Sequence, residues 1–397
     1  MTDTDHLYNS DAVKGIFDKN YFAYKNLGFR VIERGTIVPY VNVGKNGRRV
    51  WEFGGVVDKN GKFIKSSVGK FGAETVYTPQ EEIPYVPATV IYAGLFYPIW
   101  GHFISEGLRY FWTFANDFCR EHFKDCPLAY IPCELKYFIE EQKNFRRLLE
   151  ITGVDTDKFT PINRPTKFEN IILPDESFFL DNDDGLIKFT DAYRETIDRV
   201  RNFALKNRTP TSSKKIFYFY GRAQTGEERL AEYFRGKGYE IISPENLTFD
   251  EQLNLLINTE SFASTLGSCS HNSIFLRDGA EVILIPRAAN RLSYQLTLDA
   301  VHQLNVNYVD SSLSTFDTHN GPYCYIISER LKKFFGEKFD GYTDDDFKTF
   351  LEYAKLAVSN GLIFNAAENY YGEVLTDFLT QLKRREDLLA AYGVTLT

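Results

Sequence analysis

Hydrophobic and polar positions between Lys215 and Asp310 follow two alternating patterns. Short apolar runs are separated by longer segments in which apolar residues recur every three or four positions. The short runs predict strands at 216–220, 240–243, 261–265, 281–285 and 305–309. The longer segments predict helices at 227–235, 249–258, 270–277 and 294–303. This alternation is typical of an α/β fold in which helices cover both faces of a parallel sheet.

Small and charged residues gather at the carboxyl ends of these predicted strands. In open parallel sheets, ligands bind outside the carboxyl ends of the strands. We therefore expect an anionic ligand at this edge, where small residues and cations converge. The segments concerned are Gly221-Arg222, Ser243-Pro244-Glu245, Gly267-Ser268, Pro286-Arg287 and Asp310-Ser311.

The loop after the strand at 261–265 begins with Gly267 and opens into the predicted helix at 270–277. The first amides of a helix lack internal partners and carry partial positive charge, so a diphosphate could bind there. The side chains of the loop add hydrogen-bonding groups suited to a phosphate, a ribose or a sugar. The alternative is an ordinary helix cap, in which serine and asparagine are common. The side chains in question are those of Ser268, Ser270, His271 and Asn272.

A second informative segment is 100–118, which has the period of an α-helix and is apolar around more than half of its circumference. The remaining polar stripe has intervals of four, three and four residues, so a histidine and a glutamate lie one turn apart and can share a hydrogen bond. The alternative is a solvent-facing edge of ion pairs. A glycine beside the histidine permits close backbone approach, which favours a functional site. The stripe consists of His102, Glu106, Arg109 and Thr113, and the glycine is Gly101.

The chain of 397 residues suits two domains with a helical extension. Residues 207–214 are polar and include Pro210, which is typical of an interdomain linker. We predict an α/β domain at 1–207, a Rossmann-like domain at 208–330, and helices at 331–397 that pack back on the domains.

Composition excludes several classes of protein. A net charge of −8 argues against nucleic-acid binding. The amino terminus lacks the pattern of a signal peptide, and the sequence contains no apolar stretch of 18 residues. The five cysteines are scattered without CxxC spacing, which fits reduced thiols in a cytoplasmic protein and indicates no zinc site.

Several blocks together resemble glycosyltransferase family 61, in its bacterial capsule and exopolysaccharide branch. The resemblance extends from about Tyr92 to Asp310, and the order and spacing of the blocks match the family. The blocks are Ile216 to Arg222, Gly238 to Leu247, Glu251-Gln252, Gly267-Ser268 with His271-Asn272 and Phe275, and Trp100-Gly101-His102-Phe103 with Glu106.

This resemblance implies a GT-B fold, in which two Rossmann-like domains face a cleft. It also implies inverting, metal-independent transfer of a hexosyl or N-acetylhexosaminyl group from a nucleotide-sugar to a hydroxyl of an oligosaccharide or polysaccharide, without a cofactor. The family's second arginine is missing here, so phosphate charge would fall on Arg287 or Arg291. The implied donor-binding residues are Arg222, Glu245, Gly267, Ser268, Ser270, His271, Asn272 and Arg287.

Sugar transfer requires a base that removes the proton of the acceptor hydroxyl. We predict His102 as that base, oriented by Glu106, and the reverse assignment stays open. An alternative is a metal-dependent transferase in which Asp181 and Asp183 bind Mn²⁺ or Mg²⁺, although an Asp-rich turn is usually a solvated loop. Another alternative is a non-catalytic nucleotide- or sugar-binding subunit.

A lipid-linked acceptor would bring the protein into peripheral contact with the inner membrane. Lys383-Arg384-Arg385 is the only candidate surface that we identified for anionic headgroups, and its alternative is a solvated helix face.

Overall fold

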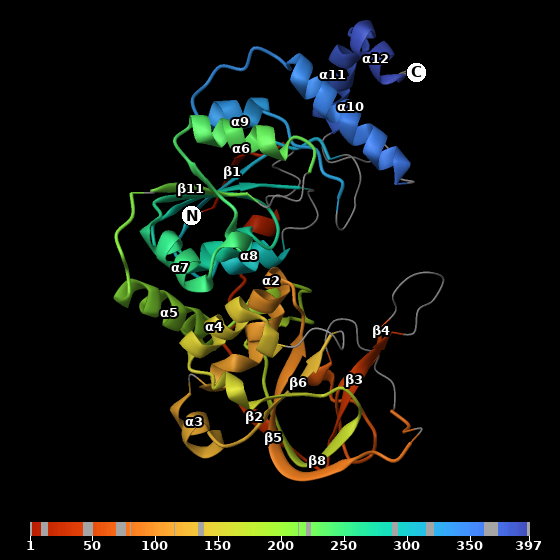
Figure 1. Cartoon of the computed structure of the whole chain (residues 1–397), viewed down its shortest axis with the longest axis vertical. Coiled ribbons are helices and arrows are strands. Elements are labelled where there is room, and N and C mark those ends of the chain that lie inside the picture. Colours follow the sequence, from red (N-terminus) through yellow and green to blue (C-terminus); the bar gives the residue numbers. More distant parts are fainter. Residues whose placement is uncertain are drawn as a thin grey trace. The chain divides into compact units, whose positions relative to one another are not determined.

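The computed structural model describes residues 2–8, 15–42, 51–68, 77–79, 81–114, 116–133, 139–212, 214–219, 224–287, 293–314, 321–360 and 372–394. The chain forms two compact units, and Figure 1 traces it in colour from one end to the other. Unit 1 comprises residues 1–20, 208–247 and 251–397, and unit 2 comprises residues 21–207 and 248–250. The division at 207–208 coincides with the predicted linker. The first twenty residues, however, belong with the second half of the chain.

Unit 1 contains a six-stranded sheet in the order β1-β15-β14-β13-β11-β12, and every neighbouring pair is parallel. Five of the strands were predicted from the apolar runs. The sixth, β1, pairs with β15 although about 300 residues separate them in the sequence. The strands are β1 (Thr2–His6), β11 (Lys215–Tyr218), β12 (Glu240–Ile242), β13 (Ser261–Thr265), β14 (Glu281–Ile285) and β15 (Asn305–Val309).

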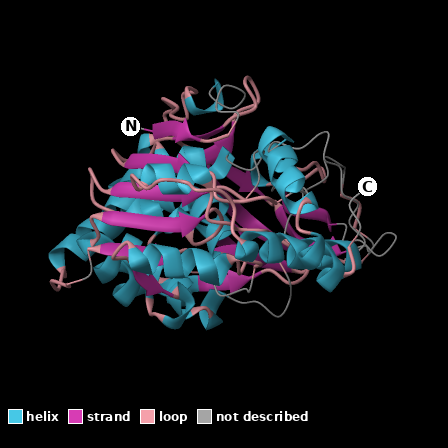
Figure 2. Cartoon of the chain, turned by 90° about the horizontal axis from the view of Figure 1, so that it is seen from above, coloured by secondary structure: helices cyan, strands magenta, loops and turns pink. Residues whose placement is uncertain are grey.

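Helices cover both faces of this sheet, which confirms the prediction made from the alternating pattern. Figure 1 shows α6 and α9 on one face and α7 and α8 on the other, and Figure 2 distinguishes helices from strands by colour. Alternate residues of the strands, such as Phe217 and Ile283, pack in one buried cluster with Leu230 and Phe234 of α6. The helices are α6 (Glu227–Gly236), α7 (Phe249–Asn258), α8 (Ser293–Asp299) and α9 (Glu329–Phe334).

Unit 2 contains a mixed seven-stranded sheet in the order β4-β3-β8-β5-β6-β7, with β2 also paired to β8. The β5-β8, β5-β6 and β6-β7 pairs are parallel, whereas β2 and β3 run antiparallel to β8. The prediction of a mixed α/β first half is therefore confirmed. The strands are β2 (Phe29–Glu33), β3 (Thr36–Asn42), β4 (Trp51–Val57), β5 (Tyr85–Phe96), β6 (Leu128–Pro132), β7 (Phe159–Pro161) and β8 (Thr166–Pro174), beside a hairpin of β9 (Phe178–Leu180) and β10 (Ile187–Phe189).

The longer α-helices of unit 2 have clear local signals. In α3 (Asp117–Phe123), the Asn116 side chain caps the first turn by accepting a hydrogen bond from the Cys119 amide at 3.1 Å. Helix α4 (Lys143–Thr152) ends at Gly153, whose φ of 96° suits glycine at this position. Helix α5 (Asp191–Lys206) leads to the division between the units. No helix in the described ranges is long and apolar enough to cross a membrane.

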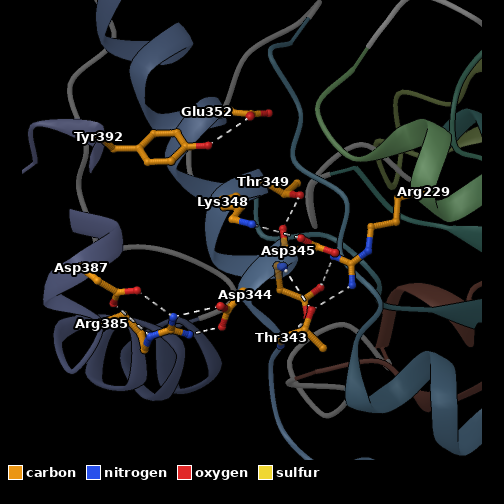
Figure 3. Close-up of polar contacts among 11 residues, drawn as sticks. Arg229, Thr343, Asp344, Asp345, Lys348, Thr349, Glu352, Arg385, Asp387 and Tyr392 are labelled. Atoms are coloured by element: carbon orange, nitrogen blue, oxygen red, sulfur yellow. Dashed lines mark hydrogen bonds and ion pairs between the residues drawn. The ribbon is translucent and has the colours of Figure 1, made fainter. Parts of the chain in front are cut away.

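The three C-terminal helices form a buried apolar cluster with Tyr8, Leu313 and Ile326, so they are part of unit 1. They are α10 (Asp344–Ser359), α11 (Gly372–Lys383) and α12 (Glu386–Tyr392). In the basic run at 383–385, Arg385 forms ion pairs with Asp344 and Asp387, as Figure 3 shows. This arginine therefore joins α12 to the start of α10.

A capping box at the start of α10 is tied to α6. The Thr343 amide donates to Asp346 at 2.7 Å, and the Asp346 amide donates to the Thr343 hydroxyl at 3.3 Å. Arg229 of α6 forms an ion pair with Asp346 at 2.6 Å (Figure 3). The Asp346 side chain is almost fully buried, so its charge depends on this partner.

We predict that Asp346→Ala lowers the free energy of unfolding by about 2–3 kcal/mol, because it removes the cap and leaves Arg229 without its partner. The matched control is Asp345→Ala, because Asp345 is exposed and its nearest ion-pair partner is Lys348 at 3.6 Å. That control should change the free energy by no more than about 0.5 kcal/mol in urea unfolding. Equal losses in the two variants would contradict the role given to Asp346.

Candidate functional site

The turn after β13 brings Gly267 against the guanidinium group of Arg287. A Cβ atom at Gly267 would lie 2.7 Å from one terminal nitrogen of Arg287 and 2.8 Å from its Cζ. The φ angle of Gly267 is 149°, a backbone conformation that residues other than glycine rarely adopt. The backbone conformation therefore favours glycine here, and any larger residue would also have to displace the Arg287 guanidinium.

The Ser270 hydroxyl stabilises this turn from inside the protein. It accepts a hydrogen bond from the Gly267 amide at 3.0 Å and has the Gly267 carbonyl and Gln295 Oε1 as acceptors, each at 2.7 Å. Gln295 in turn donates to Asp299 at 2.7 Å. Burial raises the pKa of Asp299 to about 7, while hydrogen bonds from Tyr308 and Gln295 oppose this shift. Ser270, which the sequence suggested for donor binding, thus has its hydrogen-bonding capacity used within a buried network.

The other residues of the loop divide into buried and accessible ones. The segment predicted as a helix at 270–277 is the short 3₁₀ helix η7 (Ser270–Phe275). Asn272 is buried, and its amide donates to the Cys269 carbonyl at 3.1 Å. Ser268 and His271 are partly exposed, so their side chains are the accessible ones of the four predicted loop residues.

Arg287 follows β14 and stacks on the ring of Tyr323, with 5.1 Å between its Cζ and the ring centroid. Its Nε atom is buried and has no hydrogen-bond partner among the described residues. The same residues offer it no ion pair within 4.0 Å. Buried cations in proteins are normally paired, so this arrangement is suited to an anionic ligand.

Glu227, at the start of α6, is a charged residue that the sequence did not identify as part of the site. It is 2% exposed, and its Oε2 atom has no hydrogen-bond partner within the described parts of the chain. Burial raises the pKa of its carboxyl to about 7. The positive charge of Arg287 lowers this pKa and the negative charge of Glu245 raises it. The acidic pair Glu227-Glu228 was visible in the sequence, but the burial of Glu227 was not.

Two hydroxyl groups complete this polar cluster. Thr265 at the end of β13 and Tyr325 are both buried, and neither hydroxyl has a hydrogen-bond partner in the part of the chain that is described. The Thr265 hydroxyl is near enough to the Glu227 carboxyl to lower its pKa, and Tyr325 lies within electrostatic reach of the same carboxyl. Since most buried polar groups are hydrogen-bonded, several unsatisfied atoms in one place distinguish this edge of the sheet.

Three further charged residues were predicted to bind the donor, and the structure describes only one of them. Glu245 lies in the 3₁₀ helix η6 (Pro244–Asn246) after β12 and is exposed. Arg222 and Arg291 lie outside the described residues.

In unit 2, the segment predicted as one α-helix over 100–118 contains three kinds of helical turn. It consists of α2 (Trp100–His102), the π-helix η2 (Phe103–Gly107) and the 3₁₀ helix η3 (Leu108–Phe114), before α3 begins at Asp117. The expectation of a continuous α-helix is therefore wrong. π-Turns inside helices are rare overall, and those that occur are often found at functional sites.

The expected contact between His102 and Glu106 is present. His102 Nδ1 lies 3.1 Å from Glu106 Oε2. With a proton on Nδ1, His102 donates to Glu106 and its Nε2 is free to accept a proton. The His102 side chain is 33% exposed and that of Glu106 is 17% exposed, so the imidazole is the more accessible of the two. The ring of Tyr97 lies beside His102, with 5.5 Å between centroids.

The remainder of the polar stripe is largely enclosed, which argues against the alternative of a solvent-facing edge. Arg109 is 12% exposed and forms an ion pair with Glu176 at 2.8 Å. Thr113 is buried, and its hydroxyl donates to the Tyr110 carbonyl at 3.0 Å. Glu106 lies within electrostatic reach of Arg109. The pair of His102 and Glu106 therefore adjoins a buried network of charges.

The Asp-rich turn between β9 and β10 is closed by a lysine. Lys188 forms ion pairs with Asp181 at 2.9 Å and with Asp184 at 2.7 Å. The Asp183 amide also donates to Asp181 at 3.0 Å. The described residues contain no group of three or more histidine, cysteine or acidic side chains that could hold a metal ion. These contacts show that the Asp181 carboxylate stabilises the turn.

Comparison with known protein families places both sets of residues in one matched segment. Residues 100–283 match the family model Glycosyltransferase 61. The match shows that this segment is similar to the family, and it begins at Trp100, two residues before His102. It also contains Glu227 and the Gly267 turn, while Arg287 lies four residues beyond its end. No curated protein matches the chain.

We predict that Gly267→Ala displaces Arg287 and weakens the binding of a nucleoside diphosphate at least about tenfold, with a loss of stability of about 1–3 kcal/mol. Gly238→Ala is the matched control, because Gly238 has a φ of 83° but nothing within 4 Å of its Cβ position. It should lose stability through backbone strain alone. Titration calorimetry on both variants measures the difference, and equal affinities would refute the role assigned to the Gly267–Arg287 contact.

Proposed function

We propose that this protein transfers a sugar from a nucleotide-sugar to a hydroxyl of an oligosaccharide or polysaccharide, with inversion at the anomeric carbon and without a metal ion. The observation that carries this proposal is the family match over residues 100–283, because it includes both the His102–Glu106 pair and the Gly267 turn. The match supports the transferase class. The donor, the stereochemistry and the acceptor are part of the proposal.

The donor diphosphate would bind at the carboxyl end of the parallel sheet in unit 1. The Arg287 guanidinium, held between Gly267 and the ring of Tyr323, supplies the positive charge. Ser268 and His271 are partly exposed on the same turn and supply hydrogen-bonding groups. As the bond to the sugar breaks, negative charge grows on the diphosphate, and a cation already in place stabilises it.

The acceptor hydroxyl must lose its proton while it attacks the anomeric carbon, and His102 is the group we assign to this step. Its Nδ1 is bound to Glu106 at 3.1 Å, which fixes the orientation of the ring and leaves Nε2 to take the proton. The reverse assignment, with Glu106 as the base, is less compatible with its lower exposure of 17%.

Metal independence is supported by the contacts of the Asp-rich turn. A metal ion at Asp181 would have to compete with the ammonium group of Lys188 at 2.9 Å. In the metal-independent reaction, Arg287 compensates the charge on the leaving diphosphate instead. Transfer should therefore be unaffected by EDTA.

The biological context of the proposal rests on the resemblance to the bacterial branch of the family. It comprises a role in capsule biosynthesis in the cytoplasm, peripheral contact with the inner membrane, and a GT-B arrangement of two Rossmann-like domains. The blocks that carry the resemblance include Gly238 to Leu247 and His271-Asn272.

We predict that His102→Ala lowers the turnover number by about 10²–10⁴ while nucleotide binding is retained, because the variant lacks the base but keeps the donor site. The control is His122→Ala, since His122 is exposed and its Nδ1 contacts the Phe118 carbonyl at 2.9 Å. The assay is the release of UDP, GDP or CMP from the corresponding nucleotide-sugars, with and without EDTA. Activity of His102→Ala within a few fold of the unaltered protein would overturn the assignment, and loss of activity in EDTA would overturn metal independence.

A further inference from the structure

The turn that carries Glu227 is held from two directions. A Cβ atom at Gly226, directly before Glu227, would lie 2.0 Å from the Tyr325 carbonyl oxygen and 2.9 Å from Cγ2 of Thr349 in α10. Two residues after Glu227, Arg229 forms its ion pair with Asp346 of α10 (Figure 3). The first turn of α6 is thus packed against a backbone carbonyl and anchored to the C-terminal helices, which keeps Glu227 in its buried position.

The surroundings of Glu227 contain one cation without a direct counter-ion. Thr265, Tyr325 and the backbone at Gln224 lie around the carboxyl, and Arg287 and Glu245 act on it electrostatically. On α6 itself, Glu228 is exposed and Arg229 is engaged by Asp346. Within the described residues, Glu227 and Arg287 are not within 4.0 Å of each other. Their charges therefore interact without forming an ion pair, and the low polarity around Glu227 strengthens that interaction.

We infer that Glu227 is a positioning residue for donor binding: by gaining or losing a proton, it sets how much positive potential Arg287 presents to the diphosphate. This inference rests on the proposed function, since it concerns the same donor site. When Glu227 is neutral, the charge of Arg287 is available to the donor. When Glu227 is ionised, its negative charge opposes the binding of a second anion next to Arg287.

The direction of the pH effect follows from linkage. Burial raises the pKa of Glu227 to about 7 in the unliganded protein, and a bound diphosphate raises it further because like charges repel. Donor affinity is therefore highest below about pH 7 and falls as the pH rises through the pKa of the unliganded protein. By reciprocity, donor binding near neutral pH takes up protons. If donor binding raises the pKa of Glu227 by one further unit, the affinity for the donor is about tenfold lower at high pH than at low pH.

Titration calorimetry between pH 6 and 8.5 tests this inference with UDP-N-acetylglucosamine, UDP-glucose, GDP-mannose and CMP-N-acetylneuraminate as probes. Their phosphates are esterified and do not titrate in this range, which removes a competing source of pH dependence. The variants are Glu227→Gln and the matched control Glu228→Gln, which removes an exposed carboxyl one residue away. Two buffers with different ionisation enthalpies measure proton uptake by the unaltered protein, so the test does not depend on the folding of any variant.

The expected result is a loss of affinity of about tenfold from pH 6 to 8.5 in the unaltered protein and in Glu228→Gln, with proton uptake near pH 7.5. The Glu227→Gln variant should bind with nearly constant affinity over the same range. An affinity that is independent of pH in the unaltered protein, or an equal slope in Glu227→Gln, would overturn the inference while leaving the proposed function intact. No binding of any probe at any pH would contradict both.

Discussion

The close approach of Arg287 to Gly267 is the contact on which the candidate site in unit 1 depends. A guanidinium group with its Nε buried needs either a counter-ion or a ligand, and the described residues supply no ion pair for it. It stacks on the ring of Tyr323 and lies close to the backbone of Gly267. The strands β13 and β14 bring the two residues together, because they are parallel neighbours and both end at the same edge of the sheet.

Elements distant in the sequence support this edge. Strand β1 extends the sheet beside β15, and the helices after residue 343 hold the first turn of α6 through Asp346 and Thr349. The C-terminal helices therefore do more than cover apolar surface, because they contact Gly226 and Arg229, on either side of the buried Glu227. Perturbed charged groups such as the buried Glu227 and the partly buried Arg287 are common at binding sites.

Much of the sheet in unit 1 was predictable from local sequence, because each of its strands from 215 onward is a short apolar run bounded by turn residues. Strand β1 was not, since its sequence, Thr2–His6, is polar and its pairing with β15 is a tertiary effect. Periodicity also placed His102 next to Glu106 correctly, yet it could not reveal the π-turn between them. Glu227 was overlooked because charge on a helix is usually solvated, and only the packing of Tyr325 and α10 shows that this carboxyl is buried.

The most direct test of the account is the thermal stability of the unaltered protein and of Arg287→Gln with UDP, GDP and CMP, each with and without EDTA. A ligand at about 100 times its Kd stabilises the folded state by roughly 2.7 kcal/mol, which should raise the Tm by about 3 °C in a chain of this length. The account predicts that one nucleotide stabilises the unaltered protein equally in EDTA and has little effect on Arg287→Gln. A metal-independent donor site at Arg287 would be contradicted by any of three results. The stabilisation disappears in EDTA, it survives in Arg287→Gln, or no nucleotide stabilises the protein.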